Sequence, residues 1–161
     1  MGFPVLPQRD AAQVGERVFF SKDVSQIARI SLRQLQWWDE RRLVSPEQQE
    51  HRRAYSSQQV LEILTIATLR KKGMSLQTIK VVVRQLRRQL GQLEKKDVDQ
   101  PALYVLTDGK SVYLEGQPER VVNRLSKART GMYLVCLSDL IRVMTTKKFP
   151  QRYLTKQLQL F

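Results

Sequence analysis

The sequence predicts a mainly α-helical N-terminal part, a connecting helix and a small α+β unit at the C-terminal end. Between residues 21 and 93, apolar residues recur three or four positions apart, the spacing that places them on one face of a helix. After residue 101, short runs of β-branched and aromatic residues alternate with helical patterns. A chain of 161 residues is long enough for one medium-sized domain or two small ones.

The chain is strongly basic, with a net charge of +13. Residues 1–97 contain 18 Lys+Arg and 10 Asp+Glu, net +8, and residues 98–161 contain 10 and 5, net +5, so the excess is spread along the chain. This balance favours a polyanionic partner, most commonly nucleic acid. A basic ribosomal or membrane-surface protein would have the same bulk charge, so charge alone does not decide between them.

Cysteine content and hydropathy further narrow the class of protein to which this chain can belong. The single cysteine, Cys136, rules out an internal disulfide framework and a metal site built from several thiolates. No apolar run approaches the roughly 18 residues of a membrane span, and residues 1–18 lack the unbroken apolar core of a signal peptide. We therefore expect a cytoplasmic protein that makes no membrane contact and needs no cofactor.

The first expected helix begins near Ser21, which is a good N-cap, and Asp23 in its first turn suits the helix dipole. The chain then has to turn at residues 28–30. Ser31 is the next N-cap and opens a second helix, in which Leu35 and Trp38 point to the core.

The outer face of this second helix contains Arg33, Gln34, Gln36 and Trp37. Arginine pairs with guanine and glutamine with adenine in the major groove, so the face is chemically able to read bases. On an isolated helix a solvated charged face would explain the same residues. The preceding helix and tight turn favour the DNA interpretation.

A basic loop follows, with His51, Arg52, Arg53 and Tyr55. One helix in the major groove and a charged loop on the phosphates is how a winged helix-turn-helix meets duplex DNA. We expect this domain over residues 19–74, after an N-terminal arm at 1–18. His51 has no carboxylate or second histidine nearby in sequence, so we expect a solvated loop residue there. The expected DNA-binding residues are Ser31, Arg33, Gln34, Gln36, Trp37, Arg52, Arg53 and Tyr55.

The same stretch resembles the DNA-binding domain of the MerR family of bacterial transcription regulators. That family typically has Val-Ser, then Arg-Thr-Leu-Arg-Tyr-Tyr-Asp/Glu, where residues 30–40 read ISLRQLQWWDE. Its Gly-Leu-Leu/Ile-x-Pro corresponds to RLVSP at 42–46, and its Tyr-Arg-x-Tyr-Ser to RRAYS at 52–56. The junction Gly-Phe/Met-Ser-Leu appears as GMSL at 73–76.

By this resemblance Arg53 and Tyr55 would grip phosphates, while Arg33 and Trp37 would face the groove and its rim. It also implies a homodimer on inverted-repeat promoter DNA that it distorts, near the nucleoid, with RNA polymerase as a further candidate partner. The sequence does not show whether a small-molecule effector binds, or whether the protein activates or represses.

The chain departs from the family pattern at several positions. Arg29 stands where the family often has glycine in the turn. Tryptophans replace the paired tyrosines, and Gln36 replaces a customary arginine, which should change base preference. Trp38 is expected in the core, whereas Trp37 either contacts the DNA rim or packs under the wing.

A connecting helix is expected over residues 75–97. Residues 56–59 carry a Ser-x-x-Gln capping signal for the helix before it, which Gly73 ends, and Ser75 starts the next helix. Apolar residues then alternate at spacings of three and four, the pattern of a coiled-coil seam. The seam is short, and Gly91 weakens it by up to about 1 kcal/mol. Its later members lie among polar residues and are expected to contact a second subunit: Leu86, Leu90 and Leu93.

The C-terminal unit, residues 101–145, should have the order strand-strand-helix-strand-helix. Strands are expected at 103–106, 111–114 and 132–137, with a hairpin turn at 107–110. A helix from Pro118 should turn Val121, Val122 and Leu125 inward, and a last helix capped by Ser138 or Asp139 carries Leu140, Ile141 and Met144. So small a unit buries little, so we expect it to dock against a second copy.

The remaining residues bear on functions other than transcription regulation. Cys136 in mid-strand is expected to be core rather than reactive. The tail, residues 146–161, is either an amphipathic segment that docks on a partner or disordered. An enzyme is not expected, because no phosphate loop, metal-ligand cluster or nucleophile–histidine pair is present. Two alternatives remain: an architectural or recombination-directionality DNA-binding protein, and an antitoxin-like adaptor whose C-terminal unit binds another protein.

Overall fold

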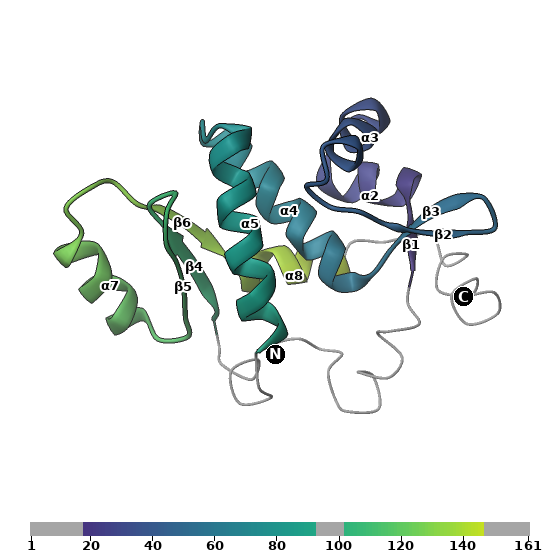
Figure 1. Cartoon of the computed structure of the whole chain (residues 1–161). Helices are drawn as coiled ribbons and strands as arrows, with labels where there is room; N and C mark the ends of the chain where they lie inside the picture. Colours follow the sequence, from purple (N-terminus) through teal and green to yellow (C-terminus); the bar gives the residue numbers. More distant parts are fainter. Residues whose placement is uncertain (1–17, 93–101, 147–161) are drawn as a thin grey trace. The chain divides into compact units, whose positions relative to one another are not determined.

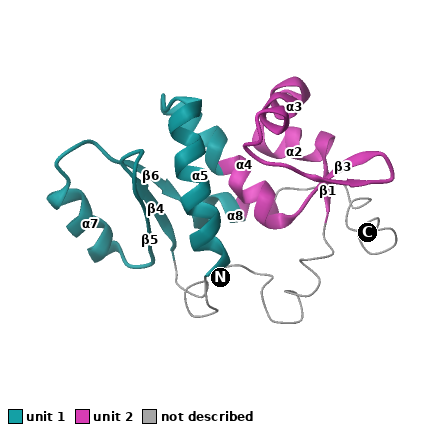
Figure 2. Cartoon of the chain, viewed as in Figure 1, with its two compact units in different colours: residues 1–3, 65–141 teal, residues 4–64, 142–161 magenta. Residues whose placement is uncertain are grey.

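The computed structural model describes residues 18–92 and 102–146 (Figure 1). The chain divides into two compact units, one formed by residues 4–64 with 142–161 and the other by residues 1–3 with 65–141 (Figure 2). The expected N-terminal arm, the end of the connecting helix and the tail lie outside the described residues.

The unit that contains residues 18–64 has two short helices, a small sheet and the start of a longer helix. Its sheet has the order β1-β3-β2, and both pairs of strands are antiparallel. The elements are β1 (Phe19–Phe20), α2 (Ser21–Ala28), α3 (Leu32–Glu40), β2 (Glu47–Gln49), β3 (Arg52–Tyr55) and the first part of α4 (Ser57–Lys71). This confirms a helix-turn-helix followed by a β-hairpin, which we call the wing (residues 47–55).

Helix α2 begins one residue earlier than expected. Its N-cap is Phe20, and Ser21 is already helical. The Phe20 amide donates to Oδ2 of Asp23 at 2.9 Å, which is the contact that the N3 side chain makes with the N-cap amide in a capping box. Ser31 does cap α3 as predicted, since its Oγ accepts from the Gln34 amide at 3.0 Å.

Both turns that flank α3 contain an arginine with left-handed backbone. Arg29, at the C-cap of α2, has φ 56°, and Arg42, just after α3, has φ 59°. At both positions the sequence pattern of the MerR family often has glycine. A left-handed conformation costs a residue with a Cβ about 1 kcal/mol or more, so each arginine is held at some expense in stability.

The core of this unit follows the predicted spacing. Leu35 and Trp38 are 2% and 1% exposed, which confirms Trp38 as a core residue. Val24 and Ile27 of α2 are buried with them in the unit. Tyr55, at the end of β3, is also completely buried.

The unit that contains residues 65–141 has the predicted α+β order after its helices. Gly73, with φ 98°, separates α4 from α5, and Ser75 caps α5 by accepting from the Thr78 amide at 3.2 Å. The elements are α5 (Leu76–Gly91), β4 (Tyr104–Thr107), β5 (Val112–Glu115), α7 (Pro118–Lys127), β6 (Tyr133–Cys136) and α8 (Leu137–Thr146), whose last residues belong to the other unit.

Helix α8 begins directly after β6, at Leu137, and is not capped by Ser138 or Asp139 as expected. Instead, the Leu137 amide donates to the carbonyl of Leu103 at 2.8 Å, and the Ser138 hydroxyl accepts from the Leu103 amide at 2.8 Å. These bonds fix the start of α8 to the residue that precedes β4.

The C-terminal sheet has the order β5-β4-β6, with β4 antiparallel to both neighbours. The predicted hairpin turn is present: Oδ1 of Asp108 accepts from the amides of Lys110 and Ser111 at 2.8 Å each. These backbone hydrogen bonds lower the pKa of Asp108. Strands β5 and β6 are therefore parallel to each other, and α7 is the crossover helix that connects them.

Two of the expected inward positions are wrong. In α7 only Val121 is buried, while Val122 and Leu125 are 64% and 40% exposed. The reason is geometric, because a single ten-residue helix over a three-stranded sheet buries only the narrow stripe that faces the strands. In α8, by contrast, Ile141 and Met144 are buried within the single chain, although a second subunit was expected to cover the apolar residues of this helix.

The connecting helix α5 is packed within the chain more fully than its sequence suggested. Leu86 is completely buried and Leu90 half-buried, while Leu93 lies outside the described residues. Side chains of α5 hold the adjoining hairpin: Gln89 donates to the carbonyl of Val112 at 2.7 Å, and Gln85 donates to that of Lys110. Leu86 therefore needs no second subunit to cover it, contrary to expectation.

Candidate nucleic-acid interface

Helix α3 presents the polar face that its sequence predicted. Arg33, Gln36 and Trp37 are exposed and Gln34 is half-buried, while Leu35 and Trp38 point into the unit. Ser31 uses its Oγ for the helix cap, so any contact with DNA has to share that oxygen or use the Ser31 backbone.

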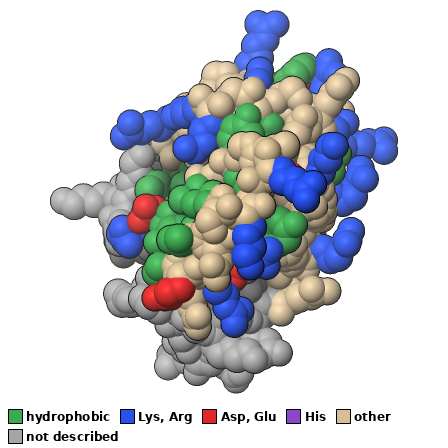
Figure 3. All heavy atoms as spheres, turned by 90° about the vertical axis from the view of Figure 1, so that its left-hand side faces the viewer, with side chains coloured by type: hydrophobic (Ala, Val, Ile, Leu, Met, Phe, Trp, Pro, Cys, Tyr) green, Lys and Arg blue, Asp and Glu red, His purple; other side chains and the backbone are tan. Residues whose placement is uncertain are grey.

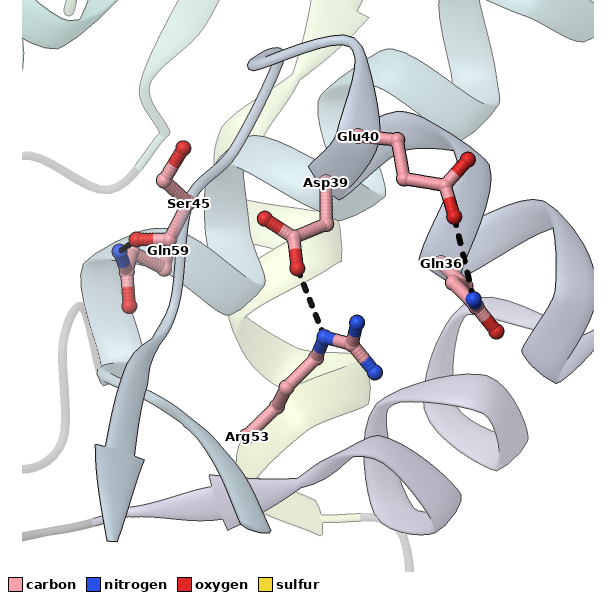
Figure 4. A network of polar contacts seen from close by, with 6 residues as sticks. All are labelled: Gln36, Asp39, Glu40, Ser45, Arg53 and Gln59. Carbon is pink, nitrogen blue, oxygen red and sulfur yellow. Dashed lines mark hydrogen bonds and ion pairs between the residues drawn. The ribbon is translucent and has the colours of Figure 1, made fainter. Parts of the chain in front are cut away.

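Gln36 is already engaged on the helix surface. Its Nε2 donates to Oε1 of Glu40 at 3.1 Å, one turn further along α3 (Figure 4). A bidentate contact with adenine needs both the amide N–H and the amide oxygen. The amide nitrogen has two N–H donors, so Gln36 keeps its second N–H and its oxygen for an adenine while it is bonded to Glu40.

Trp37 is partly exposed at the surface of α3. Its side chain is 37% exposed, and the Arg41 guanidinium stacks over its ring with 4.4 Å between Cζ and the centroid. Cation–π stacking orders a long side chain and keeps its charge near the ring. The exposed part of the ring is available to the rim of a bound duplex, and that contact stays a prediction.

The wing turns through Glu50 and His51, which have φ 49° and 66° and connect the last paired residues of β2 and β3. Two consecutive residues with positive φ form the turn that suits the twist of a β-hairpin. His51 is exposed, in line with a solvated tip. Arg52 stacks over the Phe20 ring at 3.6 Å.

Arg53 connects the wing to α3. Its Nε donates to Oδ2 of Asp39 at 2.7 Å (Figure 4), and both side chains are partly exposed. Gln59 of α4 also donates, through Nε2, to the Ser45 carbonyl at 2.8 Å and so holds the loop between α3 and the wing. A guanidinium has five N–H donors, so Arg53 keeps donors for a phosphate while Nε is engaged.

Tyr55 is a correction to the expected site. Its side chain is completely buried, so it is not available to a phosphate in this structure. β3 is the central strand of its sheet, and its second half pairs with β1 at the base of the wing, where side chains enter the core. Burial raises the pKa of Tyr55, although the nearby Ser21 hydroxyl opposes the shift.

The positive charge of the described chain is concentrated outside the helix-turn-helix itself. Residues 18–64 contain 7 Lys+Arg and 6 Asp+Glu, net +1, whereas residues 65–92 contain 7 Lys+Arg and no acidic residue, net +7. The two halves of the chain have similar net charges, so the excess at residues 65–92 becomes visible only when single elements are compared. All seven basic side chains are exposed: Arg70, Lys71, Lys72, Lys80, Arg84, Arg87 and Arg88.

The described residues also bear on metal binding, membrane crossing and cysteine chemistry. In residues 18–92 and 102–146, no three or more His, Cys, Asp and Glu side chains gather in a way that could hold a metal ion. None of the helices there combines the length and apolar character that a membrane crossing needs. Cys136 is a free, half-buried thiol.

Fold and exposed chemistry together define a winged helix-turn-helix DNA-binding domain. Residues 20–86 match the family model described as MerR HTH family regulatory protein. This part of the chain is therefore similar to the DNA-binding domain of MerR-family regulatory proteins. The match ends before the C-terminal sheet and covers less than half of the chain. No curated protein matches the chain.

Proposed function

We propose that this protein is a sequence-specific transcription regulator that binds inverted-repeat promoter DNA as a homodimer. The observation that carries the proposal is the outer face of α3, where Arg33 and Gln36 are exposed and Gln34 is half-buried, in a domain that matches a DNA-binding family. Those side chains read bases, because arginine and glutamine match the major-groove edges of guanine and adenine.

The phosphate contacts come from a wider set of residues. Arg52 and Arg53 lie in the first half of β3, where the side chains are partly exposed. Trp37 and Arg41, which stack on each other at the end of α3, lie at the edge of the face that meets DNA. The seven exposed cations of residues 65–92 add the charge that the helix-turn-helix lacks. Cations on phosphates supply most of the affinity without choosing a sequence.

Dimerisation follows from the inverted-repeat site. A two-fold site needs two recognition helices about one helical turn of DNA apart, and a homodimer supplies them. On α5, Leu90 and Leu93 remain candidate contacts, whereas Leu86 is used inside the chain. Such a protein acts in the cytoplasm, at promoters where RNA polymerase also binds.

Genome-wide footprinting of the bound chain tests the proposal. It should yield one enriched inverted-repeat motif upstream of genes. Arg33→Ala should cost roughly 1–3 kcal/mol on that motif and relax its sequence preference, whereas Arg53→Ala should weaken binding to all duplexes alike. Arg120→Ala, at an exposed arginine of α7, is the matched control and should change neither. Footprints without an enriched motif would reject sequence-specific regulation.

A further inference from the structure

The C-terminal sheet has an open edge. Among the described residues, β6 forms a ladder with β4 on one side only, since the strand order is β5-β4-β6. β6 contains no charged residue, whereas soluble proteins commonly protect an edge strand with lysine, proline or a bulge. An uncharged edge strand of this kind is a template on which another strand can pair.

The sheet face beside this edge is only partly covered. Leu106 of β4 pairs with Leu134 of β6, which places both side chains on one face, but Leu106 is completely buried and Leu134 is 37% exposed. On the same face, Arg124 of α7 stacks over Tyr113 and pairs with Glu115, both in β5. Helix α7 therefore covers the β5 side of this face and leaves the β6 side open.

The flank of α7 turned towards the open edge is apolar. Helical periodicity places Val122 and Leu125 on one flank, and Arg120, Arg124 and Lys127 on the opposite flank. Because Arg124 reaches β5, the apolar flank lies on the β6 side. Val122 is the most exposed large hydrophobic residue of the described chain. Figure 3 shows hydrophobic side chains gathered on this side of the molecule, with Lys and Arg around them.

We propose that a second copy of the chain docks on this surface, formed by the β6 edge with Leu134 and by Val122 and Leu125 of α7. The two β6 strands pair antiparallel and join the two sheets into one sheet of six strands. The inference rests on the homodimer of the proposed function and identifies its contact surface. A two-fold axis perpendicular to the sheet pairs β6 with its own copy and brings the apolar flanks of both α7 helices together.

Charge favours a second copy as the occupant. The basic flanks of the two α7 helices point away from the axis, so like charges do not meet at the contact. Antiparallel pairing also brings the start of one β6 beside the end of the other. Arg129 precedes β6 and Asp139 follows it, and both are exposed, so opposite charges approach each other at both ends of the strand pair.

The first test measures the mass of the full-length chain without DNA by sedimentation equilibrium. The parent should be a dimer, and Val122→Glu with Leu125→Glu should raise the dimer dissociation constant at least about 100-fold, because two charges would be buried without partners. Val81→Glu with Val143→Glu is the matched control, since these valines are 41% and 36% exposed and lie outside the surface. The control should stay within about threefold of the parent. Circular dichroism checks that each variant folds.

Leu90→Glu tests the competing contact through α5. If this variant dissociates the dimer and the α7 variant does not, the surface inference is wrong and the homodimer of the proposed function stands. A monomeric parent would reject both the surface and the homodimer. Sequence-specific DNA binding is judged independently of these masses, by the footprints.

Cross-linking gives a second readout that does not depend on a destabilising change. Cys136 is the only cysteine of the chain and lies in the four-residue β6. In an antiparallel β6 pair the two Cys136 residues lie within roughly four residues of each other, or about 13 Å at 3.3 Å per residue. A bis-maleimide linker of about that span should join two parent chains and should fail with Cys136→Ser. A dimer by mass that the linker does not join would contradict the strand pairing.

Discussion

Arg53 of the wing donates through Nε to Oδ2 of Asp39 in α3 at 2.7 Å, so one ion pair connects the two parts of the domain that are expected to meet DNA. The side chains are 35% and 21% exposed. A pair so open to solvent contributes at most about 1 kcal/mol to folding. Its main effect is to hold Arg53 at a fixed position relative to α3.

Asp39→Asn tests this positioning. The change should leave the free energy of unfolding within about 1 kcal/mol of the parent. It should lower the ratio of specific to random-duplex affinity, because Arg53 is freed for any phosphate while its register with α3 is lost. Glu47→Gln is the control, since it removes the same charge from an exposed position on β2. Fluorescence anisotropy with both duplexes measures the ratio, and equal ratios for the two variants would count against a positioning role.

The basic stretch of α5 should contribute to the salt dependence of binding. Changing Lys80, Arg84 and Arg88 to glutamine should reduce the slope of log affinity against log salt by up to about 2.7, because each phosphate that the protein neutralises adds about 0.9 to that slope. The same change at Lys110, Arg120 and Lys127, which are exposed and lie outside the proposed dimer contact, removes equal charge from the C-terminal unit and should leave the slope unchanged. Equal slopes for both triple variants would show that α5 does not touch DNA.

The sequence predicted the parts of the fold that depend on local signals. Ser31 and Ser75 cap their helices, and Gly73 takes the positive φ between α4 and α5. The spacing of Leu35 and Trp38 placed both in the core. Caps and helical periodicity act within a few residues of the chain, which explains why they can be read directly.

Features set by distant neighbours were missed. Tyr55 ends a strand that is central in its sheet, and nothing in its own segment shows that β1 pairs with it. Leu86 lies in a polar helix, but Gln85 and Gln89 of that helix donate to backbone carbonyls of the C-terminal hairpin. Polar residues on this helix therefore did not indicate a solvent-exposed surface. Val122 faces outward because the available sheet is too small to cover it.

Arg29→Gly and Arg42→Gly should each preserve or raise the stability of the fold and each weaken DNA binding. Each arginine has left-handed backbone, which costs about 1–2 kcal/mol, while glycine adds up to about 1 kcal/mol of unfolded-state entropy. Each variant should therefore be as stable as the parent or more stable by about 1 kcal/mol, measured by thermal unfolding. Both side chains are exposed beside α3, so removing them should weaken DNA binding. Arg41→Gly, at a nearby position with ordinary backbone, should instead lower stability. Full affinity in both variants would show that the arginines are merely tolerated.

Tyr55→Phe distinguishes a core residue from a phosphate ligand. No hydrogen bond of normal geometry reaches the buried Tyr55 hydroxyl in the described structure, so removing it should be neutral or stabilise the fold by about 1 kcal/mol. The folded-state pKa of Tyr55 is raised above its usual 10.0 by burial. The contribution of this raised pKa to the free energy of unfolding is therefore fully present below pH 10 and is lost as the pH rises further. Tyr55→Phe should abolish the part of the stability loss at alkaline pH that comes from this hydroxyl. Urea unfolding between pH 8 and pH 11 measures the effect, with Tyr113→Phe, at a half-buried tyrosine, as the control. DNA affinity should not change, and a tenfold loss on Tyr55→Phe would show that this side chain leaves the core to bind DNA.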